Sequence, residues 1–144
     1  MFESTRGLKN GDPVEFEGRM LEVTLGPGLL SSVYDGLQNN LTTMESVFLK
    51  RGEYTDPLDH KKLWDFTPIA KEGDKVTAAD WLGEVKEGWL PHKIMVPFSF
   101  KGEYTVKKIA EAGKYNIDMV VAVLTGADGE EAYVTMTQKW PVKV

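Results

Sequence analysis

Short stretches of alternating apolar and polar residues recur along most of this chain, a pattern typical of β-strands whose two faces meet different surroundings. Gly, Pro and Asp turns separate these stretches at intervals of about eight to twelve residues, which favours a β-sandwich or barrel over βαβ units. The expected strands are 47–49, an aromatic strand beginning at 63–66, and then 75–76, 81–85, 93–96, 104–109, 117–124 and 132–140. The sequence therefore predicts a mainly β fold.

The first forty residues follow two different patterns. Residues 11–25 alternate around a Gly18-Arg19 turn and predict an N-terminal β-hairpin. After the break at 26–28, apolar residues fall on one stripe of a helical wheel, with polar residues on the other side. This stripe predicts one short amphipathic helix over about residues 28–41, packed against a sheet.

A weak internal repeat refines the expected fold. Glu72-Gly73-Asp74 leads into the strand 81–85 in the way that Ala112-Gly113-Lys114 leads into 119–123, with a charged glycine turn before an apolar strand in each case. Two such half-units packed face to face would form a barrel-sandwich hybrid, the flattened fold that resembles biotinyl and lipoyl domains. No low-complexity linker divides the chain.

The composition narrows the possible functions. The 144 residues carry a net charge of −5 spread along the chain, and the absence of a dense Lys/Arg cluster argues against nucleic-acid binding. No apolar run reaches the roughly 18 to 20 residues of a membrane span, and the first residues lack the apolar core of a signal peptide. Cysteine is absent, which excludes disulfides and thiolate ligands. The chain is expected to be soluble and cytoplasmic, without direct membrane insertion.

Gly26-Pro27-Gly28 raises the question of a phosphate site. A glycine turn ahead of a helix is a setting in which backbone N–H groups can hold a phosphate. A phosphate loop, however, ends in Gly-Lys-Ser/Thr, so that an ammonium and a hydroxyl reach the phosphates and magnesium, and this ending is missing here. The segment is interpreted as a structural turn.

Other reactive side chains do not form a recognisable constellation. His60 and His92 are expected to be exposed or hydrogen-bonded, and they predict no metal or acid–base site. Ser31, Ser32 and Ser99 lie outside any Gly-x-Ser-x-Gly motif, and the first two are assigned to the wet side of the helix. No catalytic, cofactor-binding or metal-ligating residue is predicted in this chain.

Tryptophans are numerous for a chain of this length. Aromatic side chains fill β cores, and they also anchor protein interfaces because they bury a large area at low entropic cost. Trp64 and Trp81 are interpreted as core residues. Trp89 lies in an expected turn after Gly88, where core and interface remain equal alternatives.

Lys93 supports a competing hypothesis. In Pro91-His92-Lys93-Ile94-Met95 a lysine precedes a methionine near a strand reversal, similar to the hairpin that carries the prosthetic group in biotinyl and lipoyl domains. The acidic or small residue and the methionine expected just before such a lysine are missing, and Pro97 follows closely. The alternative function is thus a prosthetic-group carrier modified at Lys93.

A series of short motifs occurs in a fixed order along nearly the whole chain. The stretches are residues 3–5 with 7–9, 25–30 with 33–38, 51–52, 64–68, 73–76, 82–85, 92–97, 113–115 and 136–142, the last reading Met-Thr-Gln-Lys-Trp-Pro-Val. Each stretch alone is weak. Their order and spacing together resemble the catalytic A subunit of V-type and archaeal-type ATPases.

This resemblance implies a division of labour within a longer parent subunit. Residues 1–25 would be the last part of an N-terminal β-barrel, and residues 26–144 a bulge domain made of a linking helix and a β-sandwich. The phosphate loop, ATP and Mg²⁺ would belong to the rest of the parent. The chain would then be a non-catalytic structural segment that holds no cofactor itself. It would contact other subunits of the ATPase head and peripheral stalk, peripheral to the membrane, in a motor coupled to H⁺ or Na⁺.

Two features qualify the resemblance. Asn39-Asn40 stands where the family usually has Arg-Pro, which removes a possible salt bridge and hints at a divergent bacterial branch. The N-terminal piece would also be a strand cut from its barrel, and an unpaired strand edge can recruit another chain. Some tendency of the chain to form a homodimer is therefore expected.

Overall fold

The computed structural model describes residues 6–16, 21–30, 32–42 and 55–142 of the chain. Within these ranges every regular element is a β-strand, which confirms the mainly β prediction. The strands are β1 (Glu22–Leu25), β2 (Trp64–Pro68), β3 (Lys75–Val76), β4 (Trp81–Glu87), β5 (Leu90–Met95), β6 (Tyr104–Ile109), β7 (Gly113–Tyr115), β8 (Ala122–Gly126), β9 (Glu131–Val134) and β10 (Gln138–Pro141).

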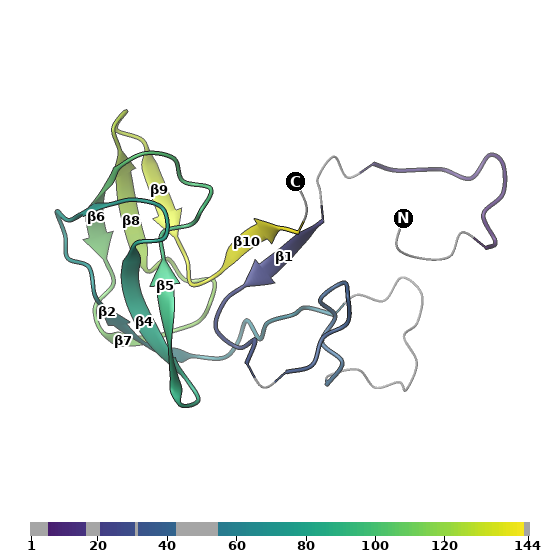
Figure 1. The fold of residues 1–144 in the computed structure, drawn as a ribbon, viewed down its shortest axis with the longest axis horizontal. Coiled ribbons are helices and arrows are strands. Elements are labelled where there is room, and N and C mark those ends of the chain that lie inside the picture. The colour runs from purple at the N-terminus through teal and green to yellow at the C-terminus, as the bar shows by residue number, and fades with distance from the viewer. Residues whose placement is uncertain (1–5, 17–20, 31, 43–54, 143–144) are drawn as a thin grey trace.

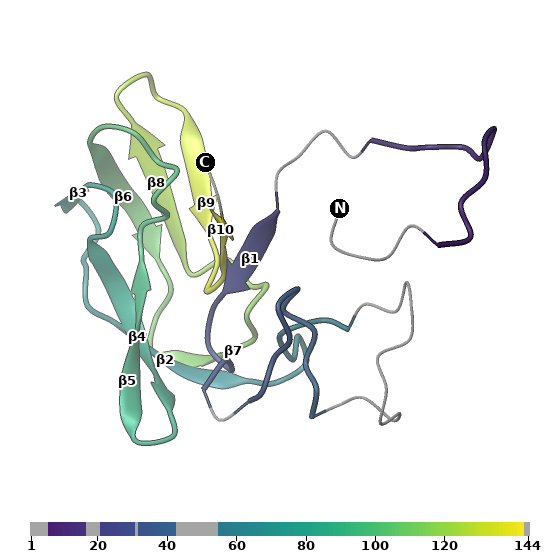
Figure 2. The same ribbon diagram turned by 45° about the vertical axis from the view of Figure 1, so that its right-hand side comes forward.

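The strands form three antiparallel sheets (Figures 1 and 2). One four-stranded sheet has the order β5-β4-β2-β7, and the other has the order β3-β6-β8-β9. These two sheets make up the sandwich. β1 and β10 pair with each other alone, as a ribbon beside the sandwich, with Glu22 opposite Pro141 and Leu25 opposite Gln138.

The strand order of one sheet becomes that of the other when the two halves of the sandwich are exchanged. Replacing β2, β3, β4 and β5 by β6, β7, β8 and β9, and the reverse, converts β5-β4-β2-β7 into β9-β8-β6-β3. Each half thus contributes three strands to one sheet and one short strand to the other. The short strands lie where the sequence showed its weak repeat: β3 directly follows Gly73-Asp74, and β7 begins with Gly113-Lys114. The expected barrel-sandwich arrangement follows from this exchange.

Two apolar clusters fill the sandwich because inward-facing residues alternate along the strands. The first cluster is centred on the aromatic strand β2 and contains Leu58, Trp64, Phe66, Val85, Ile94, Ile117, Val121 and Met136. The second contains Ala70, Val76, Leu82, Val96, Val106, Ala122, Leu124 and Val134. Ile109 of β6 packs against the first cluster, and Leu82 of β4 belongs to the second, so each cluster contacts both sheets and helps to hold them together.

A glycine permits the closest approach within the first sheet. The register between β4 and β5 shifts at Trp81/Gly83, where a bulge places Leu82 and Gly83 both in buried positions. A Cβ atom at Gly83 would lie 2.3 Å from a ring carbon of Phe66 and 2.8 Å from the carbonyl oxygen of Thr67. The side chain of Phe66 therefore occupies the space that any other residue would need.

The helix expected over residues 28–41 is wrong for the part of this segment that the structure describes. A turn forms instead, closed by a bridge between Tyr34 and Asn40 and by the hydrogen bond from Leu41 N to Val33 O. The carboxylate of Asp35 binds the backbone of this turn, and Asp and Asn side chains compete in this way with helical hydrogen bonds. The apolar stripe was produced by residues such as Val33, which is exposed.

The expected N-terminal hairpin is also wrong in its first arm. Residues 11–16 form no strand, and β1 finds its partner 113 or more residues later, in β10, rather than in the preceding segment. The hairpin's turn at Gly18-Arg19, Ser31 and the expected strand 47–49 lie outside the described residues. The division of the chain at residue 25 stays a prediction, although the β1–β10 pairing ties the two proposed parts together at that boundary.

Candidate interaction site

A buried carboxylate joins the loop after β1 to the β4–β5 hairpin. Glu87 ends β4 and is only 5% exposed. Its Oε1 accepts hydrogen bonds from the backbone N–H groups of Gly28, at 2.7 Å, and Leu30, at 2.9 Å, while its Oε2 lies 3.0 Å from Nδ1 of His92. Three partners compensate the burial of this charge. Glu87 therefore fixes the loop at residues 28–30 against the hairpin.

A cavity of about 490 Å³ lies beside this carboxylate. Its wall combines apolar surface with groups of both charges, and the Lys62 Nζ lies 4.2 Å from the ring centroid of Trp64. The residues that line it are Gly28, Leu30, Ser32, Asn40, Pro57, Asp59, Lys62, Trp64, Glu87, Gly88 and Trp89. A mixed, open hollow of this kind suits a protruding side chain of another protein.

Trp89 stands at the rim of the cavity, at the tip of the β4–β5 hairpin. The preceding Gly88 has a φ of 62°, and its left-handed conformation closes the tight turn. Trp89 is 88% exposed, whereas a tryptophan without a partner surface normally buries most of its ring. Of the two alternatives for Trp89, the structure excludes the core, and a role in an interface stays a prediction.

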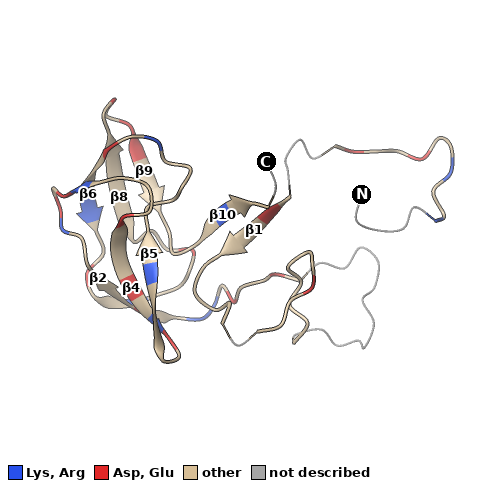
Figure 3. Cartoon of the chain, viewed as in Figure 1, with Lys and Arg blue, Asp and Glu red and all other residues tan. Residues whose placement is uncertain are grey.

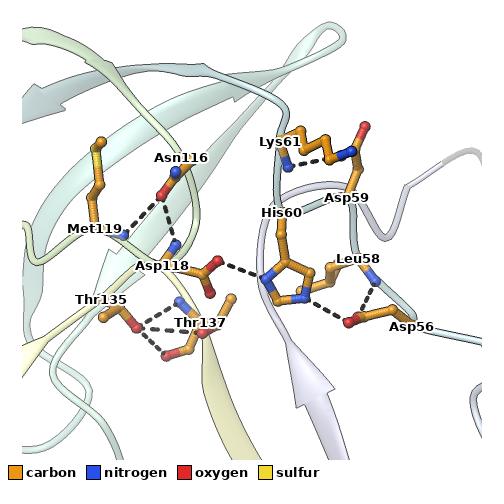
Figure 4. Close-up of polar contacts among 10 residues, drawn as sticks. All are labelled: Asp56, Leu58, Asp59, His60, Lys61, Asn116, Asp118, Met119, Thr135 and Thr137. Carbon is orange, nitrogen blue, oxygen red and sulfur yellow. Dashed lines mark hydrogen bonds and ion pairs between the residues drawn. The ribbon is translucent and has the colours of Figure 1, made fainter.

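A histidine clasp ties the segment before β2 to the turn before β8 (Figure 4). His60 Nδ1 lies 2.7 Å from Asp118 Oδ2, and its Nε2 lies 2.8 Å from Asp56 Oδ2. Hydrogen bonds to Asp118 and then to Asp56 raise the pKa of His60 above its ordinary value. All three side chains are substantially exposed, so water weakens the attraction.

A second polar network shapes the turn at residues 34–40. The Asp35 carboxylate accepts hydrogen bonds from Leu37 N, at 2.9 Å, and from Asn39 N and Nδ2, at 2.7 and 2.8 Å. Burial alone would raise the pKa of Asp35, but the bonds from Asn39 and Leu37 outweigh it and lower the pKa. Asn39 is 4% exposed and accepts a hydrogen bond from Thr55 N. In this chain Asn39 thus closes the turn and has no charge to pair.

The two tryptophans expected in the core differ in their burial. Trp64 is buried, which confirms its assignment to the core. Trp81 is 55% exposed, so its assignment to the core is wrong: it lies on the outer face of β4, where Lys93 Nζ sits 5.0 Å from its ring centroid. The bulge after Trp81 turns the next two residues inward in its place.

Lys93 lies in the middle of β5, opposite Glu84, and forms an ion pair with it. The tip of this hairpin is Gly88-Trp89 instead. A lysine that carries a prosthetic group has to project from such a tip, so the geometry removes the basis of the carrier hypothesis.

Gly26 keeps its expected role as part of a structural turn, whereas the assignment of Ser32 to the wet side of a helix is wrong because no helix forms there. A Cβ at Gly26 would lie 2.9 Å from Thr137 Cγ2 and 3.1 Å from Leu58 Cδ1, so this glycine serves close packing of the turn. Ser32 lines the cavity and Ser99 is exposed. Across residues 6–16, 21–30, 32–42 and 55–142, no cluster of three or more His, Asp or Glu side chains could hold a metal ion. Nor does this part of the chain contain a helix long and apolar enough to cross a membrane.

Sequence reasoning missed the residues that organise the site. Asp56 precedes His60 by four residues, a spacing that was visible, but Asp118 reaches the same ring only through the fold. Glu87 gave no signal, because two of its three partners are backbone groups of a loop 57 and 59 residues earlier in the chain.

The exchanged pair of four-stranded sheets defines a barrel-sandwich β domain. The family described as the ATPsynthase alpha/beta subunit barrel-sandwich domain matches residues 55–143. The chain belongs to this family.

Curated relatives extend the match to the whole chain. The V-type ATP synthase alpha chain of Chlamydia abortus is 49% identical over 99% of this chain and 24% of the relative. Proteins of the same name from Treponema denticola and Borrelia hermsii are 49% and 48% identical, over 99% and 100% of this chain and 25% of each relative. These matches confirm the resemblance drawn from the motifs. The chain spans about a quarter of the length of these relatives.

Proposed function

We propose that this chain is the non-catalytic barrel-sandwich part of the alpha chain of a rotary V-type ATP synthase. The observation that carries the proposal is the alignment of the whole chain with about a quarter of proteins named V-type ATP synthase alpha chain. The sequence contains no Gly-x-x-x-x-Gly-Lys-Ser/Thr, the motif that cradles nucleotide phosphates. Binding of ATP and Mg²⁺, and the coupled transport of H⁺ or Na⁺, are thus assigned to the rest of the parent complex.

The role left for this segment is to hold other subunits in place. Its partners would be subunits of the head and of the peripheral stalk, on the cytoplasmic side and peripheral to the membrane. Rigidity suits this role, because the stationary part of a rotary motor has to resist torque without unfolding. Two apolar clusters that join the sheets support it.

The surface that fits a partner best is the hairpin-tip surface, which we define as Trp89, Leu30, Pro57 and Lys62 around the cavity. Exposed tryptophans beside a hollow are typical of interface hot spots. Elsewhere on the sandwich acidic and basic residues are interspersed (Figure 3). Several are paired, as in Glu84 with Lys93, Lys107 with Glu131 and Lys75 with Glu103. Exposed ion pairs of this kind contribute little to stability.

The non-catalytic half of the proposal is tested by assaying ATP hydrolysis by the purified chain in the presence of Mg²⁺. The expected rate is that of the buffer, because the chain supplies no phosphate loop. The parent protein with its nucleotide-binding part serves as the positive control. A magnesium-dependent rate from the chain alone, well above background, would overturn this half.

The interaction half is tested by replacing Trp89→Ala in the parent protein and measuring its affinity for the stalk subunits. Loss of a hot-spot side chain costs about 2 kcal/mol, or about 30-fold in affinity. Tyr133→Ala is the matched control, since Tyr133 is an aromatic residue of β9 that is 62% exposed and lies away from the cavity. Equal binding by the two variants would remove the hairpin-tip surface as the contact.

A further inference from the structure

The β1–β10 ribbon has two outer edges that differ in their chemistry. Val142 N donates to Leu21 O, and residues of an antiparallel pair alternate between bonding their partner and facing outward. On β1 the outward backbone groups therefore belong to Glu22 and Thr24, and on β10 to Lys139 and Pro141. Pro141 has no N–H to offer a further strand. The β10 edge therefore lacks one of its donors, whereas the β1 edge keeps every donor and acceptor that another strand would need.

A side chain already occupies this edge. The amide of Gln38 accepts a hydrogen bond from Thr24 N at 2.7 Å through its Oε1, and it donates one to Thr24 O at 2.6 Å through its Nε2. These two bonds are the pair that a strand residue opposite Thr24 would make. Gln38 thus takes the place of one residue of a third strand.

The turn at residues 34–40 is built to present this amide. Gln38 has a φ of 64°, a left-handed conformation that is unusual for a residue other than glycine, asparagine or aspartate. The hydrogen bond from Gln38 N to Asp35 O, and the bonds of the Asp35 carboxylate to Leu37 and Asn39, hold the turn in this shape. The side chain therefore reaches Thr24 from a position that is fixed in advance.

We propose that the outer edge of β1 is a pairing surface for a second copy of this chain, and that Gln38 keeps it closed. An antiparallel pair of β1 strands centred on Val23 sets Glu22 of each copy opposite Thr24 of the other. All four of these residues face outward, so every free backbone group meets a partner across the two-fold axis. The register also keeps the two Glu22 carboxylates from lying directly opposite each other, where like charges destabilise a pair. This self-complementarity commits the surface to a second copy.

The proposal is independent of the function proposed above, and its test is the oligomeric state of the chain. The variants are Gln38→Ala and Gln38→Asn, measured by sedimentation over a concentration series. Asparagine tolerates the left-handed conformation, so it preserves the turn. Its amide is one methylene too short to reach Thr24, so the two hydrogen bonds to the edge are lost. Each dimer would displace two Gln38 side chains in the parent sequence. Both variants are expected to lower the dimer dissociation constant by about tenfold or more.

A second substitution identifies the edge. Thr24→Pro removes the outward N–H without touching the ladder to β10, and proline is tolerated at such a position of an edge strand. Adding it to Gln38→Asn is expected to return the chain to monomers. A folded Gln38→Asn variant that dimerises no more tightly than the parent sequence would overturn the proposal. Dimers that persist in the double variant would do the same, because they would pair through another surface.

Discussion

The sandwich and the turn at residues 34–40 are held in place by different forces. In the sandwich, two apolar clusters join the sheets, and the side chains alternate inward along each strand. In the turn, a few polar side chains bind backbone groups, above all Asp35, Gln38 and Asn39. Apolar burial is non-directional, whereas a hydrogen bond depends on the distance and angle between its donor and its acceptor. The sandwich is thus expected to be the more stable of the two regions.

Phe66→Ala is expected to have the largest effect, because Phe66 is 1% exposed at the centre of the first cluster. Truncating a buried phenylalanine costs about 3 to 5 kcal/mol, as the lost burial adds to the cavity left behind. Chemical unfolding measures the change. The control is Leu63→Ala, next to the start of the same strand, where an exposed side chain predicts a change within about 0.5 kcal/mol. Similar losses in both variants would contradict the assignment of the core.

Gly83→Ala comes next, at about 2 to 3 kcal/mol, because the new Cβ would overlap the ring of Phe66 and the carbonyl of Thr67. Gly36→Ala is the control: at Gly36 nothing lies within 4 Å of an added Cβ and φ is not positive, so the change should be close to zero.

The stability losses of the two sandwich substitutions are not expected to be additive. Combining Gly83→Ala with Phe66→Ala removes the ring that the added methyl group meets at 2.3 Å. The double variant is therefore expected to lose less stability than the sum of the two single losses, by about 1 kcal/mol or more. Strict additivity in unfolding experiments would show that the clash with Thr67 alone sets the cost.

Glu87→Ala tests how firmly the sandwich holds the loop at residues 28–30. It leaves the N–H groups of Gly28 and Leu30 without their acceptor, at a cost of about 1.5 to 3 kcal/mol. Hydrogen exchange should speed up at these two amides while Ile94 in the core stays protected. Glu84→Ala is the control, since its pair with Lys93 is partly exposed and stabilises by about 1 kcal/mol or less. Unchanged exchange at Gly28 would show that Glu87 does not anchor the loop.

The sandwich could be predicted from the sequence because its determinants repeat locally. Alternation located β3 and β6 at their observed bounds and β2 at its aromatic start. The repeated glycine turns indicated that the sandwich is built from two similar halves. The bulge at Gly83 could not be predicted, since it depends on Phe66 from a neighbouring strand, and for this reason Trp81 was assigned to the wrong face.

The turn at residues 34–40 and the contacts of Glu87 and Gln38 could not be predicted either, because they also depend on groups that the fold brings together. The apolar stripe from Leu29 to Leu41 has helical spacing, but Asp35 and Asn39 satisfy the backbone of a turn instead. Glu87 and Gln38 act on backbone groups far along the chain, and a backbone group carries no mark in the sequence. Polar residues that bind backbone at long range are thus the least visible part of the site.

The smallest expected effect lies in the His60 clasp, where charge and not packing joins two segments. Because Asp118 and Asp56 raise the pKa of His60 in the folded chain, the protonated ring stabilises the fold. This contribution is complete below the unfolded pKa of about 6.5 and is lost as the pH rises through the folded pKa. Exposure limits it to about 1 kcal/mol or less.

Unfolding measured from acid to alkaline pH should show this loss in the parent chain and not in His60→Gln, with Asp118→Asn intermediate. Parallel pH profiles for the parent and His60→Gln would mean that the clasp adds no stability, and that apolar contacts of Leu58 with the first cluster hold this segment by themselves.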